Sequence, residues 1–222
     1  MKSLTTILLL MLGALVASAG ETIEAQKPPR YTSSLGVKGA FDLNIPGKWT
    51  STDPDAVNTD NFGYGGAAGV VYRVMRDRHW FLEPGLMLSY NDFGIDLLAD
   101  GYTASARISK YDIVIPLTIG YQFGLFDDKR MNVMTGFEGT VCMVGSISKP
   151  VYDTDYSLYG SDGIWRRGDL KWGFGAGFVF NNVEINVMAY LGLVNQLKRP
   201  DIATSRVINE NTVCISLTYY YQ

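Results

Sequence analysis

Bulky apolar side chains alternate with small or polar ones along eight consecutive segments of the chain. The segments cover approximately residues 34–43, 62–74, 80–90, 111–121, 132–143, 170–180, 183–193 and 212–221. The fourth segment, for example, places Ile113 and Ile115 on one face and Asp112 on the other. A repeat of two residues predicts β-strands, because successive side chains point to opposite faces of a sheet. The pattern therefore predicts an all-β fold with eight antiparallel strands, each long enough to cross a lipid bilayer when tilted.

The connections between these segments alternate strictly in length. Those after the second, fourth and sixth segments are short, and the Asn181-Asn182 pair suits a tight hairpin because Asn tolerates a positive φ. The other connections are long, approximately residues 44–61, 91–107, 146–168 and 195–209. This arrangement places the short turns at one rim and the long loops at the other, as in up-and-down transmembrane barrels with short periplasmic turns.

The two faces of the predicted strands differ in a way that indicates which one meets lipid. Many of the chain's 24 Gly residues lie on the polar face, which suits a narrow lumen. The apolar face carries Trp, Phe, Tyr and Leu. Aromatic residues also gather towards the segment ends, as they do at membrane interfaces. The sequence therefore favours a closed barrel with its apolar face in the outer membrane. A soluble periplasmic barrel that carries a lipid or another hydrophobic ligand is the alternative.

The N-terminus has the organisation of a cleavable signal peptide. Lys2 precedes an apolar run over residues 7–17, and small residues suit cleavage after Ala19 or Ala25. We therefore expect residues 1–25 to be a signal peptide and residues 26–222 to form the outer-membrane barrel domain. The formal net charge of −3 does not indicate binding to nucleic acid.

Several charged residues fall on the face that the alternation turns inward. Because an isolated ion inside a barrel is costly, we expect these residues to pair or to recruit water and so to plug the lumen. A path for protons or small ions is the less favoured interpretation. The expected network comprises Lys38, Asp42, Arg73, Glu83, Asp112, Glu138, Lys171 and Glu184.

Residue types that support catalysis or metal binding are scarce. His79 is the only histidine and adjoins a short turn, so a catalytic triad or a multi-histidine metal site cannot form around it. Cys142 and Cys214 both fall on the inward face of non-adjacent strands, which favours free thiols over a disulfide. The sequence predicts no catalytic residue, cofactor or metal. An outer-membrane enzyme that acts on envelope lipids by a carboxylate mechanism is a second alternative.

The long connections carry the residues that are most suited to external contacts. Acidic groups occur near residues 53–60 and 153–162 without the spacing of an EF-hand loop, so we expect solvated charges there. The third long connection combines aromatic and arginine side chains, which often anchor interfaces. The candidate contacts are Tyr156, Tyr159, Trp165, Arg166 and Arg167. The expected partners are outer-membrane lipid, the barrel-assembly machinery and an unidentified protein or glycan at these loops.

Some local motifs resemble those of a known family. Residues 81–86 (FLEPGL) followed by Ser89-Tyr90, and residues 111–117 (YDIVIPL), resemble the third and fourth strands of the PorT-type, porin-like outer-membrane β-barrel domain family. Residues 63–66 (GYGG) and the terminal 215–220 (ISLTYY) also fit, although the chain ends in Tyr221-Gln222 where such barrels often end in Phe. The resemblance implies an eight-stranded barrel similar to OmpA or OmpX and says little about activity.

Overall fold

The computed structural model describes residues 30–46, 62–99, 102–126, 129–149, 152–159, 165–196 and 209–221. The chain divides into two units, Met1–Arg30 and Tyr31–Gln222, and the strands lie in the second. Within the described ranges no helix is long and apolar enough to cross a membrane. The expected signal peptide lies outside the described residues.

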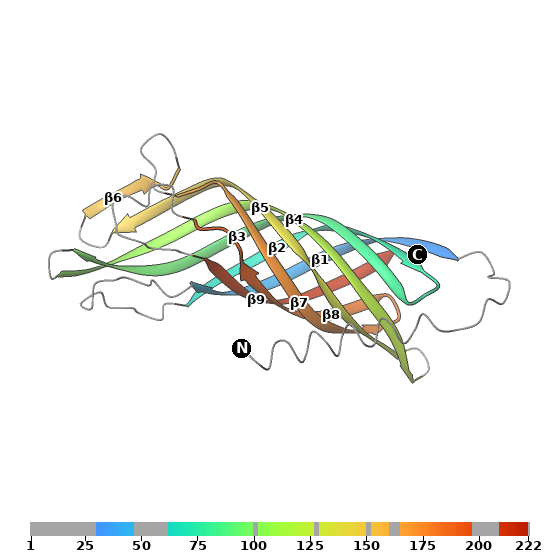
Figure 1. Ribbon diagram of the computed structural model, residues 1–222. Coiled ribbons are helices and arrows are strands. Elements are labelled where there is room, and N and C mark those ends of the chain that lie inside the picture. The colour runs from blue at the N-terminus through green and yellow to red at the C-terminus, as the bar shows by residue number, and fades with distance from the viewer. Residues whose placement is uncertain are drawn as a thin grey trace. The chain divides into compact units, whose positions relative to one another are not determined.

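An antiparallel barrel of eight strands forms the second unit (Figure 1). The strands found in the described ranges are β1 (Tyr31–Pro46), β2 (Gly63–Arg76), β3 (Trp80–Ala99), β4 (Tyr102–Phe126), β5 (Lys129–Lys149), β6 (Tyr152–Ser157), β7 (Gly168–Phe180), β8 (Val183–Gly192) and β9 (Glu210–Tyr221). The barrel strands follow the order β4-β3-β2-β1-β9-β8-β7-β5, and the pairing of β4 with β5 closes the ring. β9 pairs with β1, so the last strand meets the first as the sequence predicts. The eight-stranded up-and-down barrel is therefore confirmed.

The apolar face of every barrel strand points outward. Leu88 is 62% exposed and Leu217 is 54% exposed, whereas their neighbours Ser89 and Ser216 are buried. A soluble carrier would need the opposite arrangement, with its apolar side chains around a ligand. Apolar exposure on this scale suits a hydrocarbon environment. In hydrocarbon each backbone N–H and C=O group must also be hydrogen-bonded, and the closure of the ring meets this requirement.

Two pairs of aromatic rings mark the limits of the apolar band on β3 and β4. Trp80 contacts Tyr121 near the short turns, with ring centroids 5.1 Å apart, and Tyr90 contacts Tyr111 near the long connections, at 4.9 Å. A strand rises about 3.3 Å per residue, so a tilt of roughly 40° places the two pairs about 25 Å apart along the membrane normal. This is the height expected for the apolar band of an outer-membrane barrel.

The short turns at one rim require backbone conformations that few residues adopt. Asp77 and Arg78 have φ values of 54° and 63°, and the His79 amide donates to the Arg76 carbonyl at 3.1 Å. Two consecutive positive φ angles characterise the turns that match the twist of a hairpin. Asn181 has a φ of 54° in the turn between β7 and β8, as expected for Asn at this position.

The second long connection differs from the prediction. Residues 91–99 and 102–107 are not a loop but continue β3 and β4 as a paired hairpin, from Asn91 opposite Lys110 to Ala99 opposite Tyr102. The third connection likewise contains β6, which pairs with β5 and lies beside it at one end of the barrel (Figure 1). Outside the bilayer, backbone hydrogen bonds can maintain a strand without strict alternation of side chains. This is why the pattern underestimated the strand lengths.

A β-bulge interrupts the pairing of β4 with β5. Tyr111 is opposite Val144 but Asp112 is opposite Cys142, so Met143 is an extra residue in β5. Both Met143 and Val144 are exposed, and Gly145 then turns inward. The inward positions of β5 therefore have even numbers up to Cys142 and resume at the odd-numbered Gly145.

Candidate functional site

All eight charged residues of the expected network turn toward the lumen. Six of them are buried, and Asp42 and Glu138 are partly buried against an internal cavity. Seven of them separate into two groups, and Asp42 belongs to neither. The Arg73 cluster, near the short turns, contains Lys38, Arg73, Glu83, Glu184 and Tyr220. The Lys171 cluster, nearer the long connections, contains Lys110, Asp112, Glu138, Lys171, Glu210 and Thr212.

Arg73 is the centre of the first cluster. Its Nε donates to Glu83 Oε2 at 2.7 Å, and its Nη1 and Nη2 donate to the two oxygens of Glu184, with Nη2 2.8 Å from Oε1. The guanidinium also lies between the rings of Phe81 and Tyr220, with Cζ 4.1 and 4.5 Å from their centroids. Planar forked donors of this kind suit two carboxylates at once.

The remaining groups complete the hydrogen bonding of these carboxylates. Lys38 Nζ is 3.4 Å from Glu83 Oε1, and the Tyr220 hydroxyl donates to Glu83 Oε2 at 2.6 Å. The Asn186 amide donates to Glu184 Oε1 at 2.6 Å. Two cations therefore face two carboxylates, and the Arg73 cluster is electrically balanced.

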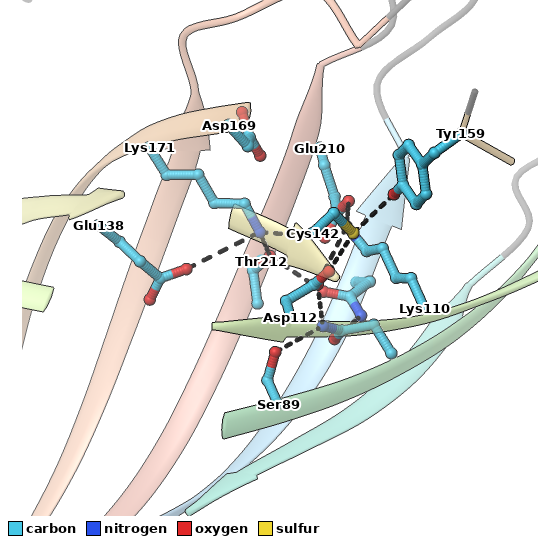
Figure 2. A network of polar contacts seen from close by, with 12 residues as sticks. Ser89, Lys110, Asp112, Glu138, Cys142, Tyr159, Asp169, Lys171, Glu210 and Thr212 are labelled. Atoms are coloured by element: carbon cyan, nitrogen blue, oxygen red, sulfur yellow. Dashed lines mark hydrogen bonds and ion pairs between the residues drawn. The ribbon is translucent and has the colours of Figure 1, made fainter. Parts of the chain in front are cut away.

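The Lys171 cluster contains two lysines that share one carboxylate (Figure 2). Lys171 Nζ donates to Glu210 Oε1 at 3.0 Å and to the Thr212 hydroxyl at 2.9 Å, and it lies 4.0 Å from Glu138 Oε1. Lys110 Nζ donates to Glu210 Oε2 and lies 3.7 Å from Asp112 Oδ2. Glu210 thus bridges β4 and β7 from its position at the start of β9.

Sequence reasoning missed three buried charges that belong here: Lys110, Asp169 and Glu210. Lys110 and Glu210 each lie two residues before an inward position, at Asp112 and Thr212. The alternation of inward and outward positions extends to both residues, but the predicted strands began too late to include them. Asp169 precedes the predicted start of its strand and has the same parity as Lys171.

Both cysteines are free and buried, as expected. Cys142 contacts Asp112 through its Sγ, and the Tyr159 hydroxyl donates to the same sulfur at 2.6 Å. Burial raises the pKa of Tyr159 above its ordinary value, so the phenol stays protonated and available as a donor. These contacts attach the third long connection to the inner wall of the barrel.

The candidate contact residues of that connection do not all lie on the surface. Tyr159 and Trp165 are buried, because Tyr159 packs over Gly145 and Trp165 contacts Phe93 with ring centroids 6.4 Å apart. Two of the five expected external contacts therefore point inward instead. Arg166 and Arg167 are exposed, with Arg167 over the Tyr159 ring at 5.2 Å. The side chain of Tyr156 lies outside the described residues.

A cavity of about 30 Å³ lies inside the barrel, beside the Lys171 cluster. Space of this size holds only a few water molecules. Asp42, Glu138 and Ser216 are among the residues that line it. Polar and apolar side chains share the lining, which also includes Lys38, Lys110, Lys171, Met87 and Met188, and a space of this size is too small for a drug-sized ligand.

The other chemical candidates form no site in the described part of the chain. His79 Nδ1 lies 3.0 Å from the Gln122 carbonyl oxygen, and its ring stacks on Tyr121 at the short-turn rim. No group of three or more His, Cys, Asp or Glu side chains is placed to hold a metal ion in the ranges that the structure describes. Of the acidic groups of the long connections, residues 53–60 and Asp162 lie outside the described residues, as do the side chains of Asp153 and Asp155.

Solved structures with the same type of fold have low similarity to this chain. Neisserial surface protein A is 9% identical, with a TM-score of 0.45, over 86% of this chain and 99% of that one. Ail, the attachment invasion locus protein of Yersinia pestis, is 12% identical, with a TM-score of 0.40, over 85% and 99%. The outer membrane enzyme PagL is 10% identical, with a TM-score of 0.42, over 82% and 98%. At these values the likeness contributes nothing to an argument about function. A search of curated proteins found no match.

A protein family matches most of the chain. Residues 24–198 match the family described as outer membrane protein beta-barrel domain. This match covers most of the closed barrel and agrees with the outward apolar face, the aromatic pairs and the short turns at one rim. The chain belongs to the outer membrane protein beta-barrel domain family.

Proposed function

We propose that this outer-membrane barrel is plugged by its two ion-pair clusters and has a structural or surface-interaction role at the end with the long connections. The observation that carries the proposal is the set of buried ion pairs inside the described part of the barrel, and the cavity beside the Lys171 cluster measures about 30 Å³. Buried ion pairs join distant strands of the wall in both clusters, Arg73 with Glu184 and Lys110 with Glu210. A nutrient or a drug-sized ligand would not pass through the lumen. The protein would therefore act through contacts at the ends of the barrel.

The end with the long connections offers the larger surface for contacts. There β3 and β4 extend as a hairpin beyond the Tyr90–Tyr111 ring pair, and β5 and β6 form a second hairpin. Arg166 and Arg167 are exposed nearby. An unidentified protein or glycan is the partner that we propose for this end, and membrane lipid and the barrel-assembly machinery are the partners that we propose for the barrel wall.

In this proposal the protein is not an enzyme, and it reaches the outer membrane through cleavage of residues 1–25. His79 lies at the short-turn rim, where it contacts a backbone carbonyl and Tyr121. Mass spectrometry of the N-terminus of the protein purified from membranes distinguishes cleavage after Ala19 from cleavage after Ala25. Membership of the narrower PorT-type group stays a prediction from the motifs.

Shortening the β3–β4 hairpin tests the surface role. Phe93 is opposite Ile108, so residues 94–107 can be replaced by an Asn-Gly turn without changing the pairing below. The matched control replaces Asn182 by Gly at the opposite rim. For a surface role, the shortened barrel should still assemble, but intact cells should lose binding to arrays of proteins and glycans. Unchanged binding, together with a sensitivity to detergents that appears only when the whole protein is deleted, would support the structural role instead.

Planar-bilayer recordings test the plug directly. The purified protein should show no steady conductance, because buried side chains from opposite walls meet inside the barrel. Stable channels of a size that passes hydrated ions would refute this part of the proposal.

A further inference from the structure

An arginine is held on the outward face of the barrel wall just beyond the apolar band. Arg107 on β4 lies two residues beyond the position opposite Asp92 on β3. The Arg107 side chain is 72% exposed, and that of Asp92 is 16% exposed. Both residues follow the outward parity of Tyr90 and Tyr111 on the same two strands. This ion pair therefore lies on the outer surface of the wall and not in the lumen.

The ion pair lies at the level expected for lipid headgroups. Asp92 is two residues beyond Tyr90, whose contact with Tyr111 marks the outer limit of the apolar band. At a rise of about 3.3 Å per residue and a tilt of roughly 40°, this is about 5 Å further along the membrane normal. The headgroup layer extends roughly 5–7 Å beyond the hydrocarbon on each side of a bilayer. Arg107 is therefore placed among headgroups and not among acyl chains.

The Asp92 carboxylate fixes one side of the Arg107 guanidinium. Arg107 Nε donates to Asp92 Oδ1 at 2.6 Å, and the hydroxyls of Ser109 and Tyr90 each donate to Asp92 Oδ2 at 3.1 Å. Three donors thus compensate the charge of this carboxylate. Among the described residues, Nη1 and Nη2 of Arg107 form no hydrogen bond or ion pair. The guanidinium therefore keeps two N–H groups for an external anion, in the planar geometry that suits a phosphate.

The wall below the ion pair has room for an acyl chain. Three outward residues of β1 and β2 are small there, since Gly66 is opposite Tyr90 on β3 and Gly39 is opposite Ala68. A Cβ at Gly39 would meet nothing within 4 Å, and one at Gly66 would meet a single atom, at 3.5 Å. A lipid whose phosphate contacts Arg107 can therefore lay a chain against this part of the wall.

We propose that Arg107 binds the phosphate monoester of an outer-leaflet lipid through Nη1 and Nη2. A phosphate monoester carries more than one negative charge near neutral pH and accepts two parallel hydrogen bonds from a guanidinium. A neutral headgroup offers neither the charge nor the paired acceptors. The proposal rests on the proposed function in one respect, because it names the kind of lipid that contacts the barrel wall.

Native mass spectrometry of the full chain, released from detergent micelles at pH 8, tests the proposal with three probes. Dioleoyl phosphatidic acid should bind. Dioleoylglycerol, which lacks the phosphate, and glycerol 3-phosphate, which lacks the chains, should each bind at least about tenfold more weakly. Arg107→Gln should weaken the binding of phosphatidic acid by about tenfold or more. Arg76→Gln is the matched control and should leave it unchanged, because Arg76 forms an exposed pair with Asp77 at the opposite rim.

Three outcomes would overturn the proposal. Equal binding of dioleoylglycerol would show that the wall selects acyl chains alone, and equal binding of glycerol 3-phosphate would show an anion site that needs no lipid. Unchanged binding by Arg107→Gln would remove Arg107 from the site. If this variant fails to fold, Arg107→Lys keeps the charge but loses the paired donors, and unchanged binding would contradict the two-donor contact.

The surface role of the long connections can be separated from this site. Arg107→Gln leaves the β3–β4 hairpin in place, so intact cells should keep their binding to protein and glycan arrays while the purified variant loses phosphatidic acid. Loss of lipid selectivity with array binding intact would refute only the lipid site. Loss of array binding in the shortened hairpin concerns the proposed function instead.

Discussion

Arg73 on β2 and Glu184 on β8 form a two-pronged ion pair inside the barrel, although their strands are three positions apart around the ring. Such a pair connects distant parts of the wall through the lumen, where backbone pairing connects only neighbours. The same guanidinium binds Glu83 on β3. One side chain therefore fixes the spacing of three strands at the level of the Arg73 cluster.

Replacing Arg73 by Ala should destabilise the barrel strongly. The change leaves Glu83 and Glu184 buried with only Lys38 to compensate them, and loss of one partner of a buried pair costs about 3–5 kcal/mol. Equilibrium unfolding in urea with the protein in liposomes measures the difference. Arg76→Ala is the control, because its pair with Asp77 is exposed and is worth less than about 1 kcal/mol. Similar stabilities for the two variants would show that Arg73 does not hold the strands together.

Replacing Leu86 by Arg should destabilise the protein in a bilayer. Leu86 is exposed on the apolar face of β3, between the Trp80 and Tyr90 levels. An arginine near the bilayer midplane of a barrel costs about 2–4 kcal/mol, and one at the interface costs at most about 1 kcal/mol. Tyr90→Arg therefore serves as the matched control. If both changes cost the same when folding into liposomes is titrated with guanidinium, the band does not lie where the aromatic pairs indicate.

Gly69 should not tolerate a side chain. A Cβ at Gly69 would lie 2.2 Å from the Leu86 carbonyl oxygen and 2.5 Å from the Met87 Cα, and backbone atoms cannot move aside cheaply. We expect Gly69→Ala to cost about 1–3 kcal/mol. Gly39→Ala is the control because its Cβ would meet nothing within 4 Å, and the change should be neutral or slightly stabilising. The thermal midpoints of the two variants, measured in one detergent, provide the comparison.

The cysteines should resist thiol reagents while the barrel is folded. Cys142 and Cys214 are buried and free, and the Cys142 sulfur is also covered by Tyr159. Maleimide labelling followed by mass spectrometry should therefore detect modification only after denaturation. Introducing a thiol at the exposed turn, as in Arg78→Cys, provides the positive control. Rapid labelling of the native protein at Cys142 would show that the third connection does not stay packed against the wall.

The alternation of side chains was sufficient to predict the barrel and to predict which face of each strand points to the lumen and which to lipid. Lipid on one side and a narrow lumen on the other impose that alternation on every membrane-spanning residue, so Arg73 and Glu184 could be assigned inward from parity alone. Their mutual contact could not be assigned, since it depends on how far β2 and β8 are offset around the closed ring.

The sequence was less informative above the membrane. There the hairpin of β3 and β4 continues without lipid to select its side chains, and Glu210 belongs to the lumen although it precedes the predicted strand. Tyr159 packs inward because Gly145 provides room beneath it, and Trp165 packs against Phe93. An aromatic residue in a loop has the same appearance in a sequence whether it faces a partner or the protein's own core.

Met143 lets β5 contain one residue more than β4 over the same stretch of the wall. Tyr111 is opposite Val144 and Asp112 is opposite Cys142, so the bulge absorbs the extra residue and Gly145 still faces inward beneath Leu158 and Tyr159. Deleting Met143 would restore regular alternation, with Cys142 inward, Val144 outward and Gly145 inward as before. A change of one residue in length at this point can therefore leave the third connection packed on the wall and every side chain that touches lipid in place.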